Sequence, residues 1–155
     1  MTLKKKHRIK KIDKNDSFDS VAVIIMNSKL QMVKKQVKKY FKNDSVENLH
    51  SMRIAIRRMR YSMELFYNCF DKKLYTNVYE HLRKMQDVVG ELRDLDVLEE
   101  KIRSVDNKQN IVIPQILYEN IISEKNEIRR AIKTELIKFV EDVQVNQFST
   151  KRLVK

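Results

Sequence analysis

The chain has 155 residues and a formal net charge of +12, because 33 Lys and Arg outnumber 21 Asp and Glu. It contains one Gly, one Pro and one Cys. This composition disfavours glycine-rich β and Rossmann-like folds, and it excludes a disulfide or zinc–cysteine framework within one chain. We therefore expect long helices, an anionic partner and a cytoplasmic protein without a signal peptide or membrane span.

The chain divides by composition into three parts. Residues 1–15 (MTLKKKHRIKKIDKN) form a basic leader without periodicity, residues 16–148 carry helical patterns, and residues 149–155 form a basic tail. The leader is either an electrostatic arm for a polyanion or a solubilising tail. The predicted domain is the middle part.

The first predicted helix covers 19–42 and the second runs from near Asp44 to around Phe70. Asp44 and Glu47 suit a capping box at the start of the second helix. The first helix has apolar residues at three–four spacing, with lysines on the adjoining polar face. Its apolar stripe comprises Val23, Met26, Leu30, Val33, Val37 and Phe41.

The third predicted helix is capped by Asp71 and ends near Ser104. A polar linker at 106–110 precedes the fourth helix, in which Pro114 suits the first turn. The third helix carries its apolar stripe at Leu74, Val78, Leu82, Met85, Val89, Leu92 and Leu95. The stripe of the fourth comprises Leu117, Ile121, Ile128, Ile132, Leu136, Phe139 and Val143.

Four amphipathic helices with short links favour an all-α fold, an antiparallel four-helix up-down bundle. One long coiled coil is the weaker alternative, because no heptad register continues through several helices.

The segment HSMRIAIRRMR, residues 50–60, is the densest basic motif of the chain. At about 100° per residue, its His50, Arg53, Arg57 and Arg60 fall within a stripe roughly 80° wide. Met52 and Met59 lie on the opposite side of the same helix. Planar guanidinium groups spaced one turn apart suit a polymeric anion, because each bonds phosphate oxygens bidentately.

The segment LRKMQDVVGELRDLDVL, residues 82–98, is the second dense motif. Its glycine, Gly90, costs a helix about 1 kcal/mol relative to Ala. It shares the polar face with Arg83, Asp87 and Asp94. Gly90 either leaves room for a ligand or helix to approach closely, or is a tolerated surface glycine. Asp87 and Asp94 are placed to orient arginines of the second helix.

Together the two motifs resemble the CHAD family, a histidine-containing all-helical domain. The pattern His-x-x-Arg-x-x-x-Arg-Arg-x-Arg appears whole at residues 50–60. The pattern Leu-Gly-x-x-Arg-Asp-x-Asp-Val appears at residues 89–97, with Val89 in place of Leu. The resemblance covers about residues 20–145.

The resemblance implies binding of inorganic polyphosphate by a basic surface. Carried onto this chain, the phosphate contacts are His50, Arg53, Arg57, Arg58, Arg60 and Arg83. Arg93 with Asp94, together with Asp87, becomes the orienting set. Helical periodicity adds four further basic residues on polar flanks, namely Lys35, Lys38, Arg129 and Lys133.

Family members commonly have about twice this length, with two related bundles around a pseudo-twofold axis. A single bundle here predicts a homodimer that restores the twofold arrangement. Ile54, Tyr61 and Leu65 lie on one flank of the second helix. They form either the dimer interface or a contact with a neighbouring helix of the same bundle.

Three other functions compete with polyphosphate binding. Electrostatic binding of nucleic-acid backbones fits the charge, but Tyr61 and Tyr67 are too few aromatics for a single-strand stacking groove. An enzyme is disfavoured, because HExxH, His-Asp, EF-hand and Walker-type patterns are missing from the sequence. A structural bundle with a solvated basic face is the third. We expect non-catalytic binding, without cofactor, metal or catalytic residue, in the cytoplasm at polyphosphate granules.

Overall fold

The computed structural model describes residues 12–109 and 112–148, and the part that it describes is built from helices without a strand. The five α-helices are α1 Phe18–Lys42, α2 Val46–Leu65, α3 Lys72–Gln109, α4 Gln115–Glu141 and α5 Val143–Gln147. A 3-10 turn, η1 Tyr67–Cys69, lies between α2 and α3. The predicted all-α class is confirmed.

Serine side chains cap the first two helices. Ser17 accepts a hydrogen bond from the backbone N–H of Ser20, and Ser45 accepts one from that of Asn48. Each serine thereby satisfies an N–H group that has no partner within its helix. The predicted capping box at Asp44 is wrong, because the neighbouring Ser45 takes the cap position.

Two predicted helix ends are also wrong. α2 ends at Leu65 and the chain continues through the 3-10 turn, so the second helix does not reach Phe70. The third helix continues to Gln109, past its predicted end near Ser104 and into the predicted linker. The predicted cap of α3 is confirmed, since the Asp71 carboxylate accepts from the backbone N–H of Leu74 at 2.9 Å.

Asp142 ends α4 and begins the short helix α5. Its carboxylate accepts hydrogen bonds from the backbone N–H groups of Gln144 at 2.6 Å and Val145 at 3.1 Å. Asn77 donates to it at 3.3 Å, and His81 Nε2 lies 3.1 Å away. Burial alone would raise the pKa of Asp142, but these hydrogen bonds outweigh it and lower the pKa. Asp142 therefore anchors α5 to α3.

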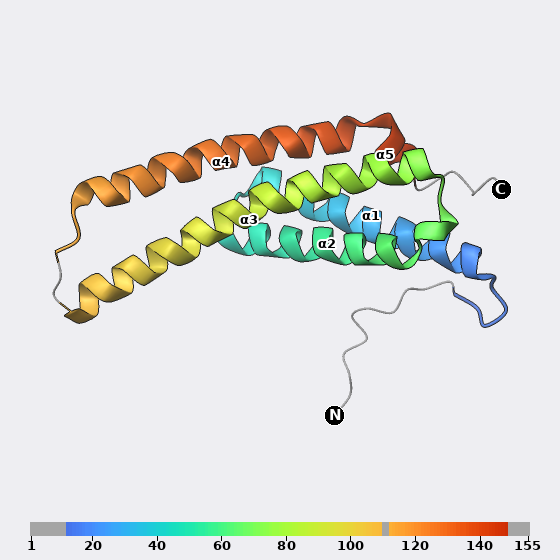
Figure 1. Ribbon diagram of the computed structural model, residues 1–155, viewed down its shortest axis with the longest axis horizontal. Coiled ribbons are helices and arrows are strands. Elements are labelled where there is room, and N and C mark those ends of the chain that lie inside the picture. The colour runs from blue at the N-terminus through green and yellow to red at the C-terminus, as the bar shows by residue number, and fades with distance from the viewer. Residues whose placement is uncertain (1–11, 110–111, 149–155) are drawn as a thin grey trace, which may run out of the picture.

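Successive long helices run in opposite directions and form two hairpins, α1 with α2 and α3 with α4 (Figure 1). α2 packs against α3, and α5 contacts both α3 and α4. α1 and α4 contact each other much less. The second hairpin extends well beyond the end of the first. α3 and α4 therefore have a part that α1 and α2 do not accompany. The four-helix up-down bundle, which needs four helices side by side, stays a prediction.

One apolar core joins the hairpins at the end where they overlap. All four long helices contribute fully buried side chains to it. The largest are Tyr40, Phe139, Met26, Leu30, Met52, Ile56, Met59, Met63, Leu82, Met85, Leu92 and Ile132. Cys69 is buried in the same core.

Three residues predicted for the core are exposed instead. Phe41 faces the surface, and its neighbour Tyr40 takes the buried position on α1. Leu117 lies on the extended part of α4, where α1 and α2 do not cover it. Val143 is exposed because the chain turns at Asp142. An exposed position leaves such a side chain without most of the burial that stabilises a core residue.

Candidate functional site

The face of α2 opposite the core carries the first basic motif. Met52, Met59 and Met63 are fully buried, so the helix presents its other side to solvent. His50, Arg57 and Arg58 are exposed, and Arg53 is half-buried. We call His50, Arg53, Arg57 and Arg58 the basic stripe. It covers about 12 Å of helix at 1.5 Å per residue.

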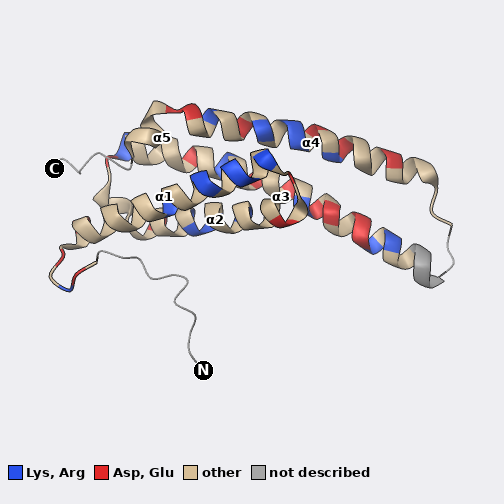
Figure 2. Ribbon diagram, turned by 180° about the vertical axis from the view of Figure 1, so that it is seen from behind, with Lys and Arg blue, Asp and Glu red and all other residues tan. Residues whose placement is uncertain are grey.

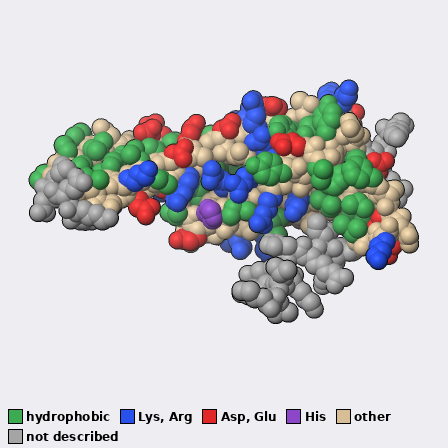
Figure 3. All heavy atoms as spheres, turned by 60° about the horizontal axis from the view of Figure 1, so that its bottom comes forward, with side chains coloured by type: hydrophobic (Ala, Val, Ile, Leu, Met, Phe, Trp, Pro, Cys, Tyr) green, Lys and Arg blue, Asp and Glu red, His purple; other side chains and the backbone are tan. Residues whose placement is uncertain are grey.

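The basic stripe has unsatisfied charge. Among the residues that the structure describes, none of its four side chains forms an ion pair or a hydrogen bond. Lys and Arg side chains gather around the one histidine visible on this face of the molecule (Figure 3). Guanidinium groups held near one another without counter-charges attract anions. Because these groups are carried by one helix, the helix fixes the spacing between them.

Arg60, the last arginine of the motif, lies in a different environment. Its guanidinium donates to the hydroxyl of Tyr79 at 2.7 Å and stacks over the Tyr79 ring at 4.9 Å. That hydroxyl in turn donates to Glu64 at 2.7 Å. Burial lowers the pKa of Arg60, but Tyr79 and Glu64 more than compensate and raise it. Arg60 thus joins α2 to α3, and its charge is partly neutralised.

Gly90 lies on α3, the helix that packs against α2. Arg60 contacts Tyr79, and α2 and α3 run in opposite directions (Figure 1). Stepping back along α2 to His50 therefore corresponds to stepping forward along α3 to Val89. Gly90 thus lies near the level of His50. No atom comes within 4 Å of the position that a Cβ would occupy on Gly90, so this part of the surface is open.

The predicted orienting residues do not contact the stripe. Within the described part of the chain, Asp87, Arg93 and Asp94 form no ion pair or hydrogen bond through their side chains. Asp87 acts on Arg60 only through its charge, which raises the arginine pKa. Arg83, predicted as a phosphate contact, pairs with Glu80 at 2.9 Å.

A mostly buried ion cluster that sequence reasoning missed joins the C-terminal end of the second motif to α4. Lys125 Nζ on α4 lies 2.6 Å from Asp96 Oδ1 and 2.8 Å from Glu99 Oε2 on α3. Arg103 binds the other oxygen of Glu99 at 2.7 Å. Burial lowers the pKa of Lys125, but the two carboxylates outweigh it and raise the pKa. We call Asp96, Glu99 and Lys125 the α3–α4 ion cluster.

The four basic residues added from periodicity do not join the stripe. Lys35 and Lys38 line a separate groove between α1 and α4. Lys133 pairs with Asp44 at 3.1 Å, and Arg129 donates to Asn126 at 3.3 Å. Figure 2 shows most basic residues of α1 in its C-terminal half, and both acidic and basic residues along the extension of α3. The predicted site residues therefore divide among several surfaces.

The described residues contain no group of three or more His, Cys, Asp or Glu side chains that is arranged to hold a metal ion. No helix among them is both long and apolar enough to cross a bilayer.

Comparison with known proteins identifies the family. The model of the CHAD domain matches residues 3–103, a span that contains both motifs. Comparison with curated proteins and with solved structures gave no match. The matched span covers most of the 155-residue chain, and the chain therefore belongs to the CHAD family.

Proposed function

We propose that this protein binds inorganic polyphosphate without catalysis, and that the basic stripe of α2 is the centre of the site. One observation carries the proposal. The four side chains of the stripe are presented together on one helix and have no counter-charge among the described residues. Membership of the CHAD family, which is associated with polyphosphate binding, supports it.

The chemistry of the stripe matches a phosphate polymer. Arg53 and Arg57 are about 6 Å apart along the helix axis, so their guanidinium forks can each bind a phosphate group of the same extended chain. His50 adds a hydrogen-bond donor to the same surface. Arg60 supports the site as a helix-to-helix contact, because Tyr79 and Glu64 already occupy it. The open surface at Gly90 lets the polymer lie close to α3.

Nucleic-acid backbone binding is the second candidate, and an exposed tyrosine favours it. Tyr61 follows Arg57 by one helical turn and is 62% exposed. A base can stack on such a ring, whereas polyphosphate offers no ring to stack. Replacing Tyr61 with Ala should therefore weaken nucleic-acid binding and leave polyphosphate binding unchanged.

Competition separates the two candidates. Labelled long-chain polyphosphate is bound to the protein near physiological salt and displaced with duplex DNA at equal phosphate concentration. Weak displacement by DNA supports polyphosphate selectivity. Equal displacement, together with a steep loss of binding with salt, favours generic phosphate-backbone binding. Phosphate release from polyphosphate in the presence of Mg²⁺ or Mn²⁺ would contradict the non-catalytic assignment.

We also propose that the chain is half of a two-bundle arrangement and completes it as a homodimer. Tyr61 and Leu65 on α2 are 62% and 70% exposed, and Ile54 is half-buried. Large apolar side chains exposed together are typical of protein interfaces. Light scattering at working concentration tests the proposal, and a monomeric mass would contradict it.

A further inference from the structure

A groove between α1 and the C-terminal part of α4 forms a second concave surface. Its volume is about 630 Å³, within the range of small-molecule sites. It is lined by Gln31, Lys34, Lys35, Val37, Lys38, Lys39, Phe41, Lys42, Ile137, Val140, Glu141 and Asn146. None of these belongs to α2, so the groove is distinct from the basic stripe. The helices contact each other little here, which leaves the space open.

Apolar side chains form the inner part of this groove. Val37 is buried, whereas Phe41, Ile137 and Val140 are each more than one-third exposed although they are large and apolar. Contact between water and these apolar surfaces is unfavourable. An apolar ligand that covered them would be stabilised by roughly 25 cal/mol for each Å² removed from water. A hydrated inorganic polyanion has no such contact to make.

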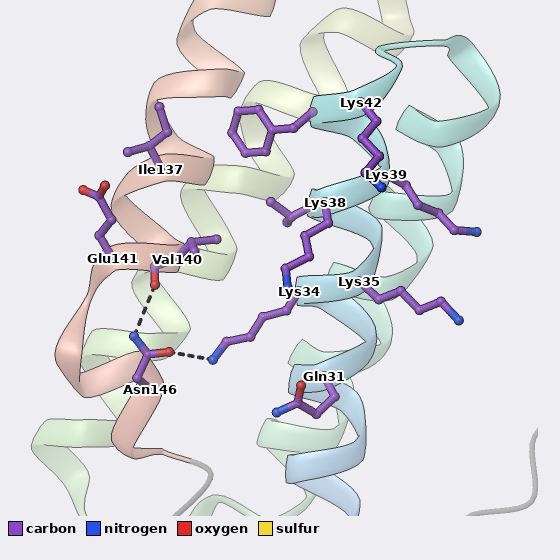
Figure 4. Close-up of a pocket in the computed structure, with 12 residues that line it drawn as sticks. Gln31, Lys34, Lys35, Lys38, Lys39, Lys42, Ile137, Val140, Glu141 and Asn146 are labelled. Atoms are coloured by element: carbon purple, nitrogen blue, oxygen red, sulfur yellow. Dashed lines mark hydrogen bonds between the residues drawn. The ribbon is translucent and has the colours of Figure 1, made fainter.

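Lysines of α1 lie along one side of the apolar part. Figure 4 shows Lys34 reaching across the groove to Asn146, whereas Lys38 runs along α1 toward Lys34. Lys34 Nζ donates to the Asn146 side chain at 2.6 Å, and Asn146 donates to the carbonyl of Val140 at 3.2 Å. This arrangement holds the ammonium group at the edge of the apolar surface. Burial, together with the charge of Lys38, lowers the pKa of Lys34.

The groove has a large excess of positive charge. Five lysines line it, and Glu141 is its one carboxylate among the described residues. None of the five lysines forms an ion pair within the part of the chain that the structure describes. Charged groups that repel one another at the edge of an apolar surface are stabilised when an anion arrives.

We propose that this groove binds an anionic amphiphile, a long-chain carboxylate or alkyl phosphate, with its head on Lys34 and Lys38 and its chain along Phe41, Ile137 and Val140. The head receives charge-assisted hydrogen bonds from the two ammonium groups. The chain covers the exposed apolar side chains. Both parts are required, which distinguishes this ligand from polyphosphate, whose charge is continuous along its length.

Calorimetric titration with monomeric myristate tests the proposal. Myristyl alcohol presents the chain without the charge, and butyrate presents the charge without the long chain. We expect saturable binding of myristate and at least about tenfold weaker binding of each comparison compound. Equal binding of all three compounds would overturn the proposal, as would no binding of myristate. A parallel titration uses phosphatidylglycerol vesicles, and binding to these vesicles without binding of myristate would also overturn it.

Substitutions locate the site. Lys34→Glu with Lys38→Glu should weaken myristate binding at least about tenfold. The matched control, Lys72→Glu with Lys101→Glu, makes the same charge change at exposed lysines outside the groove and should have no effect. Equal loss in the groove pair and the control pair would show a generic charge effect and overturn the proposal.

A second pair tests the apolar part of the groove. Ile137→Gln with Val140→Gln should also weaken myristate binding, whereas Ile116→Gln with Ile122→Gln, at exposed apolar positions elsewhere on α4, should not. Circular dichroism confirms that each variant is folded. Unchanged binding in the groove variants would contradict the assignment. The groove contains no residue of the basic stripe. Arg53→Glu with Arg57→Glu should therefore leave myristate binding intact.

Discussion

The α3–α4 ion cluster should contribute strongly to stability, because its charges are mostly removed from water. The side chains of Lys125 and Asp96 are only 11% and 8% exposed. Lys125→Met keeps an unbranched side chain that lacks only the terminal ammonium group, and so removes the charge. Glu99 retains Arg103, but Asp96 loses the ammonium group 2.6 Å away. A buried carboxylate without a partner is expensive, since breaking a buried pair costs roughly 3–5 kcal/mol.

We place the cost of Lys125→Met at about 3 kcal/mol, at the low end of that range, because Glu99 keeps its second partner. The free energy of unfolding in urea measures it. The matched control is Lys133→Met, which breaks a pair with Asp44 whose side chains are 45% and 44% exposed. That change should cost less than about 1 kcal/mol. Equal costs for the two substitutions would refute the reasoning.

The cluster also predicts a dependence of stability on pH. The pKa of Lys125 is raised above its ordinary value of 10.5. Its contribution is therefore fully present below that pH and is lost as the pH rises through the folded-state pKa. The pKa of Glu99 is lowered from 4.5 by hydrogen bonds from Lys125 and Arg103. The contribution of Glu99 is present above that value and is lost as the pH falls through the lowered pKa.

Three further substitutions test individual contacts. Gly90→Ala should stabilise the protein by up to about 1 kcal/mol in urea unfolding, because α3 gains a better helix former without a clash; a destabilised variant would contradict this. Asp142→Asn should lower the free energy of unfolding by about 1–2 kcal/mol at neutral pH. Because the pKa of Asp142 is lowered from 3.8, its contribution is present above that pH and is lost as the pH falls through the lowered pKa, so the variant should lose less stability in acid than wild type. An unchanged dependence of stability on acid pH would count against the cap. Tyr79→Phe removes the hydroxyl between Arg60 and Glu64 and should cost about 1 kcal/mol, while polyphosphate affinity stays within about twofold. A larger change of affinity in either direction would show that Arg60 takes part in binding.

Helical periodicity predicted the long helices well. In each of the four segments, apolar residues at three–four spacing fall on one side only if the segment is a helix, and that side then packs into the core. It failed where two neighbouring residues fit a pattern equally. Tyr40 and Phe41 both continue the apolar spacing after Val37, and only packing against the other helices selects Tyr40. Asp44 and Ser45 both suit a helix cap, and the backbone path selects Ser45.

The site was harder to predict than the fold. Spacing within one helix places His50, Arg53, Arg57 and Arg60 on one side of α2, and the structure exposes His50 and Arg57, half-buries Arg53 and engages Arg60 with Tyr79. Partners on other helices do not follow from such spacing. Lys125 interrupts the apolar stripe between Ile121 and Ile128, a signal of a buried charge that needs carboxylates. Asp96 and Glu99 lie on one face of α3, but only the tertiary structure brings them to Lys125.

Calorimetric titration of long-chain polyphosphate tests the central claim most directly. The wild-type protein is compared with Arg53→Glu plus Arg57→Glu, and with the control pair Lys72→Glu plus Lys101→Glu, which has the same net charge. Two lost charge-assisted contacts should weaken binding at least about a hundredfold in the arginine pair. The control pair should bind nearly as well as wild type. Equal affinities for the two variants would show that net charge, and not the basic stripe of α2, binds the polymer.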